Sequence, residues 1–123
     1  MTAKRKILVV DDERPIADIL ATILQKNGFD VYVAYSGTRA IELAFLIEPD
    51  LLISDVTMPD KNGIEVVAAV KAKLPQCKAL LCSGSATVAE MLKVARESGY
   101  EGDILSKPLH PHDLLVKLND LPA

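Results

Sequence analysis

Three acids, one hydroxyl and one amine occupy comparable places in this 123-residue sequence, each where a short apolar run ends. Asp11 and Asp12 follow "KILVV", and Asp55 follows "LLIS". Ser83 follows "KALLC", and Lys107 follows "DILS". The apolar runs have the length and composition of buried strands. In a parallel sheet the carboxyl ends of the strands meet at one edge, so these five side chains are expected to converge there.

Such a cluster suits phosphoryl transfer. Carboxylates held close together raise one another's pKa unless a cation lies between them. Ligands that are all oxygen favour Mg²⁺ or Mn²⁺ over zinc, and Mg²⁺ keeps waters that a phosphoryl oxygen can replace. Lys107 adds a second positive charge, and Asp55, alone at its strand end, is the best-placed nucleophile. Singly, each residue has an ordinary interpretation, such as Asp12 as a helix N-cap, but their joint placement favours a phosphoryl site.

Five alternations of strand and helix would position these residues. Strands are expected at residues 6–10, 30–35, 51–54, 78–82 and 103–106. Helices are expected along the apolar stripe of residues 16–24, from the cap Ser36 to about 47, at about 64–73 and 88–97, and over a final segment lined by Leu114, Leu115, Leu118 and Leu121.

Continuous apolar strands separated by crossover helices predict a parallel sheet covered on both faces. The expected fold is therefore an α/β, (βα)5 flavodoxin-like three-layer sandwich. Right-handed crossovers favour the strand order 2-1-3-4-5, with a crevice at the carboxyl ends of the first and third strands. Residues 1–123 are expected to form one domain.

Composition is typical of a soluble globular protein. Half of the residues are hydrophobic, 25% are charged, and the formal net charge is −3. Direct binding of nucleic acid is not expected, because it would need a basic balance. The apolar run at residues 7–10 is too short for a signal peptide, so a cytoplasmic location without membrane association is expected. Cys77 and Cys82 match no zinc spacing and are interpreted as ordinary thiols.

The segments "VVDDE", "DVTMPDKNG", "LLCSGS" and "LSKP" resemble the receiver domain of two-component response regulators, of the chemotaxis-receiver type, over essentially the whole chain. The resemblance implies that Asp55 accepts a phosphoryl group from the phosphohistidine of a sensor histidine kinase or phosphotransfer protein, and that it shares in an Mg²⁺ site. It also implies a phosphoacceptor switch that promotes its own phosphorylation and dephosphorylation, not an enzyme that turns over a substrate.

The other site residues take their roles from the same resemblance. Asp12 would bind Mg²⁺ directly, Asp11 would bind it largely through water, and the backbone carbonyl of Thr57 would complete the protein's share of the metal shell. Ser83 would be the switch hydroxyl that turns towards the phosphoryl group, and Lys107 its salt-bridge partner. The output would be a changed surface on the fourth helix, fifth strand and fifth helix, where an output domain, a partner or a second copy docks.

One position departs from the family pattern. The family often has an aromatic residue three places before the lysine, and here that residue is Ile104. The nearest aromatic, Tyr100, lies outside the expected strand. The hypothesis is that phosphorylation is coupled to the outer face of the fifth strand more weakly than usual, or that repacking of aliphatic side chains carries this coupling.

Three alternatives share parts of this pattern. A flavodoxin-type module would need a loop rich in Ser, Thr or Gly after the first strand, where this chain has "DDERP". A haloacid-dehalogenase-type enzyme would need an acid two residues after the nucleophile, where this chain has Thr57. A degenerate receiver that uses only its surface would not need all five site residues. Whether the receiver stands alone or belongs to a longer protein is left open.

Overall fold

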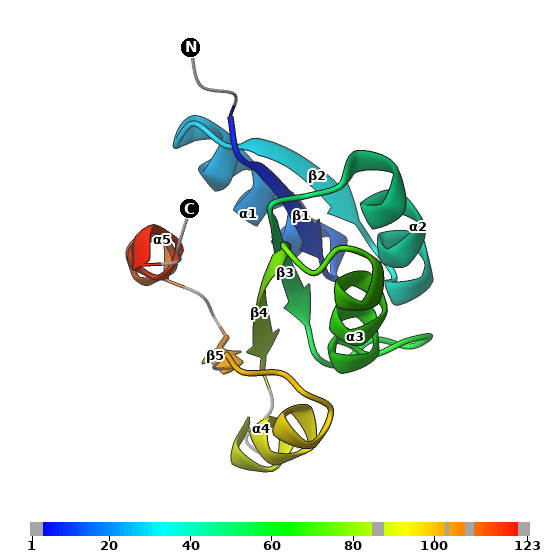
Figure 1. The fold of residues 1–123 in the computed structure, drawn as a ribbon. Helices are drawn as coiled ribbons and strands as arrows, with labels where there is room; N and C mark the ends of the chain where they lie inside the picture. The colour runs from blue at the N-terminus through cyan, green and yellow to red at the C-terminus, as the bar shows by residue number, and fades with distance from the viewer. Residues whose placement is uncertain (1–3, 85–87, 103, 108–109, 121–123) are drawn as a thin grey trace.

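The computed structural model describes residues 4–84, 88–102, 104–107 and 110–120, and five parallel strands form its sheet in the order β2-β1-β3-β4-β5 (Figure 1). The strands are β1 (Lys6–Val10), β2 (Asp30–Ala34), β3 (Leu51–Asp55), β4 (Lys78–Ser83) and β5 (Ile104–Ser106). The helices are α1 (Arg14–Lys26), α2 (Gly37–Ile47), α3 (Gly63–Lys73), α4 (Val88–Glu97) and α5 (Pro111–Asp120). The predicted fold class and strand order are confirmed. Among the described helices, none combines the length and hydropathy needed to span a bilayer.

Alternate residues of each strand enter two separate cores. In β1, Leu8 and Val10 pack with α2, α3 and α4, whereas Ile7 and Val9 pack with α1 and α5. The period-two alternation of a strand places successive side chains on opposite faces, so both faces of the central strands are buried. The result is the predicted three-layer sandwich, with two helices on one face and three on the other (Figure 1).

Two strands extend one residue further than the sequence predicts, and in both the extra residue belongs to the site. Asp55 is the last residue of β3, where it pairs with Cys82, and the Val56 amide donates to the Cys82 carbonyl at 2.8 Å. Ser83 is the last residue of β4 and pairs with Ser106. The sheet hydrogen bonds therefore hold Asp55 and Ser83 directly. Position 103, predicted to begin the fifth strand, lies outside the described residues, and β2 ends one residue earlier than predicted.

Helix starts differ in how they are capped. The Ser36 hydroxyl accepts from the Arg39 amide at 3.1 Å, which confirms the predicted cap of α2. Helix α3 has a capping box, in which Asn62 and Glu65 each accept from the other's backbone amide. Helix α1 has no side-chain cap, so the alternative role of Asp12 as a helix cap is not supported. Leu121, expected on the last helix, lies outside the described residues.

Candidate functional site

Three carboxylates meet where β1 and β3 end. Asp11 directly follows β1; its amide donates to the Ala34 carbonyl at 3.2 Å, and its carboxylate accepts from the Glu13 amide at 3.0 Å. Asp11 and Asp55 are buried, whereas Asp12 is exposed. One oxygen from each of these three aspartates lies within 4.8 Å of the others. The structure thus brings together the acids that the sequence placed at this sheet edge.

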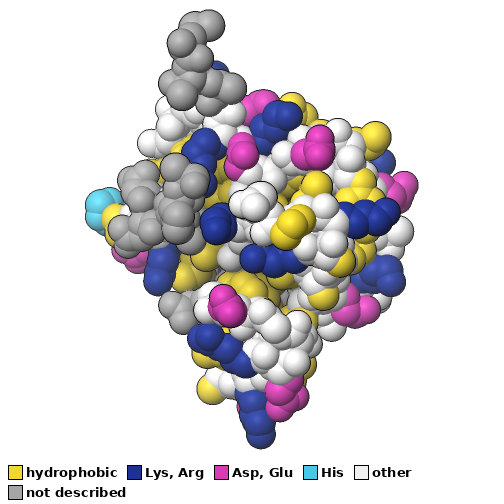
Figure 2. Space-filling view, viewed as in Figure 1, with side chains coloured by type: hydrophobic (Ala, Val, Ile, Leu, Met, Phe, Trp, Pro, Cys, Tyr) yellow, Lys and Arg dark blue, Asp and Glu magenta, His cyan; other side chains and the backbone are white. Residues whose placement is uncertain are grey.

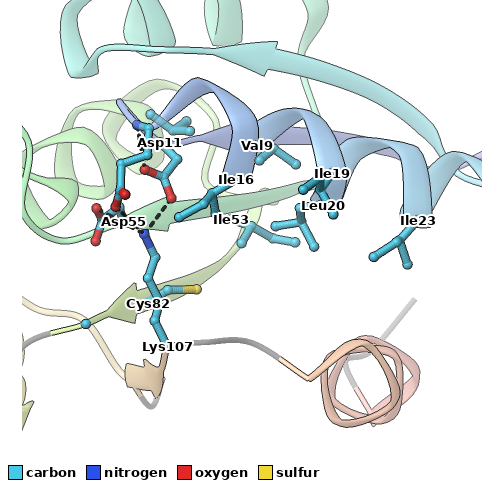
Figure 3. Close-up of a pocket in the computed structure, with 13 residues that line it drawn as sticks. Val9, Asp11, Ile16, Ile19, Leu20, Ile23, Ile53, Asp55, Cys82 and Lys107 are labelled. Carbon is cyan, nitrogen blue, oxygen red and sulfur yellow. Dashed lines mark hydrogen bonds and ion pairs between the residues drawn. The ribbon is translucent and has the colours of Figure 1, made fainter.

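Lys107 reaches the same cluster from the end of β5. Its backbone amide donates to the Ser83 carbonyl at 2.9 Å, which ties the end of β5 to β4. Its Nζ lies 2.5 Å from Asp11 Oδ2 and 3.3 Å from Asp55 Oδ2, between the two carboxylates (Figure 3). Glu13 Oε1 lies 3.8 Å from the same Nζ. The ammonium therefore bridges the two buried acids, and a surface acid lies just beyond it.

Burial and neighbouring charges shift the pKa values of Asp55 and Lys107. Burial raises the pKa of Asp55, the nearby charge of Asp11 raises it further, and Lys107 and a hydrogen bond from the Thr57 backbone only partly oppose this. Burial alone would lower the pKa of Lys107, but the hydrogen bond to Asp11 and the charge of Asp55 outweigh it and raise the pKa overall. Three carboxylates facing one ammonium leave an excess of negative charge made of oxygen donors. A hard divalent cation fits this donor set.

Ser83 lies at the same edge but its hydroxyl is turned towards α4. The side chain is buried, and its hydroxyl donates to Met91 Sδ at 3.2 Å. Thr57 lies in the loop after β3 with an exposed side chain, and its backbone hydrogen-bonds Asp55. The interaction of Ser83 with Met91 was not predicted from the sequence.

The loop between β3 and α3 is anchored at both ends. The Gly63 amide donates to the Val56 carbonyl at 2.8 Å, and a Cβ on Gly63 would lie 2.3 Å from the Asp55 carbonyl oxygen, so a side chain at that position would collide with the site. Within the loop, the Asp60 carboxylate accepts from the amides of Gly37 at 3.1 Å and Thr38 at 2.8 Å, at the start of α2. A side-chain hydrogen bond from Thr38 is the main cause that holds the pKa of Asp60 well below its usual value, and the backbone amides of Thr38, Lys61 and Gly37 lower it further. Sequence reasoning missed Asp60 because its partners lie more than twenty residues away.

An apolar cavity of about 420 Å³ adjoins the acidic cluster along α1 (Figure 3). Asp11, Asp55 and Lys107 stand at one end, and aliphatic side chains continue away from them. Two of these side chains reach the surface: Ile16 is 40% and Ile19 62% exposed. Cys82 also lines the cavity, and burial raises the pKa of its thiol to about 12, consistent with an unreactive thiol.

Tyr100 lies outside β5, as expected, and its side chain is buried in the core. Its hydroxyl oxygen accepts from the Leu81 amide at 3.2 Å, and it shares a core cluster with Ile104. The aromatic ring is therefore held by a backbone hydrogen bond of β4. Nothing tests the hypothesis that Ile104 weakens coupling to β5, and it stays a prediction.

Comparison with known proteins identifies this arrangement. The family model for the response regulator receiver domain matches residues 7–119. The chain belongs to this family. Receiver domains are phosphoacceptor modules of two-component signalling, and they interact with histidine kinases or phosphotransfer proteins.

Solved receiver structures show the same fold. The Vibrio cholerae chemotaxis protein CheY4 is 31% identical, with 98% of this chain and 100% of that chain covered and a TM-score of 0.88. A CheY-like receiver domain protein from Methanospirillum hungatei is 27% identical, with coverage of 96% and 93% and a TM-score of 0.82. A response regulator protein from Burkholderia pseudomallei, solved with a phosphorylated aspartic acid, a calcium ion and citrate, is 25% identical, with coverage of 92% and 65% and a TM-score of 0.81.

Proposed function

We propose that this receiver domain is an Mg²⁺-dependent switch in which Asp55 is the phosphoacceptor. The observation that carries the proposal is the position of Asp55, buried at the end of β3, within 4.8 Å of the acids Asp11 and Asp12 and 3.3 Å from Lys107 Nζ. The related Burkholderia pseudomallei protein carries a phosphorylated aspartic acid and a calcium ion, which supports the same chemistry here.

The donor set supports a resident divalent cation. Asp11, Asp12 and Asp55, with the backbone carbonyl of Thr57, would hold Mg²⁺, or Mn²⁺ in its place. When bound, the cation would neutralise negative charge on the phosphoryl oxygens. The excess of carboxylates over ammonium groups in the cluster is the physical reason for expecting it.

The chemical step needs little from the protein beyond position and charge. An oxygen of the Asp55 carboxylate attacks phosphorus as the P–N bond to the donor histidine breaks and a P–O bond to Asp55 forms. The donor phosphohistidine carries a proton on its other ring nitrogen, so the imidazole leaves neutral when it takes the electron pair of the P–N bond. Lys107, already 3.3 Å from Asp55 Oδ2, shifts its hydrogen bonding from the acids to a phosphoryl oxygen. Attack by water at phosphorus later restores the carboxylate and releases inorganic phosphate.

The donor would dock beside α1. Ile16 and Ile19 expose apolar surface next to the mouth of the site, and the cavity under α1 ends at Asp55. A protein donor must bring its phosphohistidine to this mouth, so the adjoining apolar surface is the natural contact for a sensor histidine kinase or phosphotransfer protein. A small donor such as acetyl phosphate would not need that contact.

The output would lie on α4, β5 and α5. Phosphorylation replaces a compact charge on Asp55 with a larger group bearing three acceptor oxygens, and Ser83 would turn towards it. The altered surface would dock a downstream partner, an output domain or a second copy. Charged side chains of both signs are interspersed on the face shown in Figure 2, and its described residues form no continuous basic surface of the kind that nucleic acid attracts. We also propose that residues 1–123 form one domain and that the protein is cytoplasmic.

Incubation with acetyl phosphate and Mg²⁺, followed by intact-mass measurement, tests the proposal. We expect one added phosphoryl group that hydroxylamine removes and that is absent in Asp55→Asn. Absence of an adduct under every condition would overturn it. Sustained release of phosphate over many turnovers would favour a dehalogenase-type phosphatase, and a yellow protein with bound flavin would favour a flavodoxin-type module.

A further inference from the structure

The Ser83 hydroxyl is engaged with a methionine of α4. Its Oγ donates to Met91 Sδ at 3.2 Å, and Ser83 itself is 2% exposed. Met91 is partly buried and packs against the core cluster that fills the space between the sheet and helices α2, α3 and α4. The contact therefore joins the end of β4 to the inner face of α4.

A serine hydroxyl has one proton and directs it to one acceptor at a time. A thioether sulfur is a weak acceptor, whereas an anionic phosphoryl oxygen forms a shorter and stronger hydrogen bond. The two acceptors compete for the same proton. A phosphoryl group therefore favours release of the Ser83 hydroxyl from Met91, and without it the hydrogen bond to Met91 Sδ remains.

We propose that Met91 is a positioning residue that holds the Ser83 hydroxyl towards α4 in the unphosphorylated protein, and that its release carries the signal directly to α4. The proposal rests on the proposed function, because it assigns a resting partner to the switch hydroxyl. It makes α4, rather than an aromatic side chain of β5, the first element to respond.

Two features of the surroundings support this route. A cavity of about 400 Å³ lies between the β3–α3 loop and α4, and Met91 lines it together with Met58 and Val94, so the released thioether has room to repack. Transmission of the signal through β5 is less favourable, because Ile104 is aliphatic and a hydrogen bond from the Leu81 amide holds the Tyr100 ring. An unbranched thioether adapts readily to such irregular space.

A thermodynamic cycle measures the competition. Beryllofluoride, BeF₃⁻, with Mg²⁺ mimics the phosphoryl group on Asp55 without turnover, and calorimetry gives its affinity. Met91→Leu keeps the volume but removes the acceptor, so we expect BeF₃⁻ to bind about two- to fivefold more tightly than to the wild type, the range of one weak hydrogen bond. In a Ser83→Ala background the same change should have no effect on affinity, since no hydroxyl is left to compete for.

Met58→Leu is the matched control. It makes the same chemical change in the same cavity, so its effect on BeF₃⁻ affinity should be the same with and without Ser83→Ala. In the wild type labelled with ¹³C at methionine methyl groups, the Met91 signal should shift when BeF₃⁻ binds, and Ser83→Ala should reduce that shift.

The outcomes separate this inference from the proposed function. If the wild type binds BeF₃⁻ and Met91→Leu changes affinity equally in both backgrounds, or in neither, Met91 does not position Ser83 and the inference is wrong. If the wild type binds no BeF₃⁻ and gains no phosphoryl group, the phosphoacceptor function itself fails and takes the inference with it.

Discussion

Lys107 places a positive charge beside the two buried acids of the site. Its Nζ lies between Asp11 and Asp55, both of which are buried, and its own side chain is 13% exposed. A buried carboxylate that loses its partner keeps the full cost of its desolvation. The lysine therefore has a structural role in the resting protein as well as its proposed role towards the phosphoryl group.

Lys107→Met removes the ammonium while keeping most of the side-chain volume. In EDTA we expect the free energy of unfolding, measured in urea, to fall by about 1–3 kcal/mol, because Asp11 and Asp55 lose their cation. Millimolar Mg²⁺ should restore part of the loss by binding the folded state. Lys107→Arg, which keeps the charge, is the control; equal stability of Lys107→Met and wild type in EDTA would contradict the account.

Gly63 is a residue at which only hydrogen fits. A Cβ there would lie 2.3 Å from the Asp55 carbonyl oxygen, and backbone cannot move aside as a flexible side chain does. We expect Gly63→Ala to lower the unfolding free energy by about 1–3 kcal/mol and also to weaken BeF₃⁻ binding, because relief of the clash displaces Asp55. At Gly28 the backbone φ is 92°, which strains any residue with a side chain, but a Cβ there would meet no atom within 4 Å. Gly28→Ala is therefore the control. It should reduce stability and leave BeF₃⁻ affinity unchanged.

Among the elements, the β3–α3 loop and α2 behave as one unit. Asp60 accepts from two amides at the start of α2, where the helix dipole also favours a negative charge. A Cβ on Gly37 would lie 2.5 Å from the Lys61 carbonyl oxygen, which shows how closely the loop packs on the helix. The loop that carries Thr57 is thus positioned from outside the site.

Asp60→Asn tests this anchor through pH. The folded protein depresses the pKa of Asp60, so its contribution to stability is present above the unfolded pKa of about 4 and is lost as pH falls through the lower folded pKa. Below about pH 4 the wild type should therefore lose more urea stability than Asp60→Asn does. Glu42→Gln, an exposed change within α2, should not alter how the free energy of unfolding depends on pH. Identical slopes for wild type and Asp60→Asn would exclude the anchor.

The elements also show which parts of the structure sequence reasoning can reach. Asp11, Asp55 and Lys107 were placed together correctly because parallel strands share one carboxyl edge, whatever the side-chain details. The capping box of Asn62 and Glu65 was readable from its spacing and was missed. The contact of Ser83 with Met91 could not be predicted, because it depends on rotamers and on the docking of α4. The extra strand residues Asp55 and Ser83 follow from cross-strand pairing, which local patterns do not specify.

At the scale of the whole molecule, the exposed apolar surface of α1 should contact a protein phosphodonor but not a small one such as acetyl phosphate. Ile19→Gln should slow phosphotransfer from a phosphorylated histidine protein by several-fold, because the contact surface loses apolar area, while the rate with acetyl phosphate stays at the wild-type value. Radiolabel transfer and intact mass measure the two rates. Leu46→Gln, at a 74% exposed position of α2, is the matched control and should affect neither. Equal slowing with both donors would place Ile19 in the site itself.

The ion pair between Asp11 and Lys107 joins residues 96 positions apart in the chain. A ribosome releases β1, β2 and β3 long before β5, so the three aspartates emerge without the ammonium that bridges Asp11 and Asp55. In a nascent chain their mutual repulsion opposes early closure of that sheet edge. Arrival of the last strand brings Lys107 to this edge and reduces the repulsion there. The charge pattern of the site thus links the first and last parts of the chain in one cooperative folding unit.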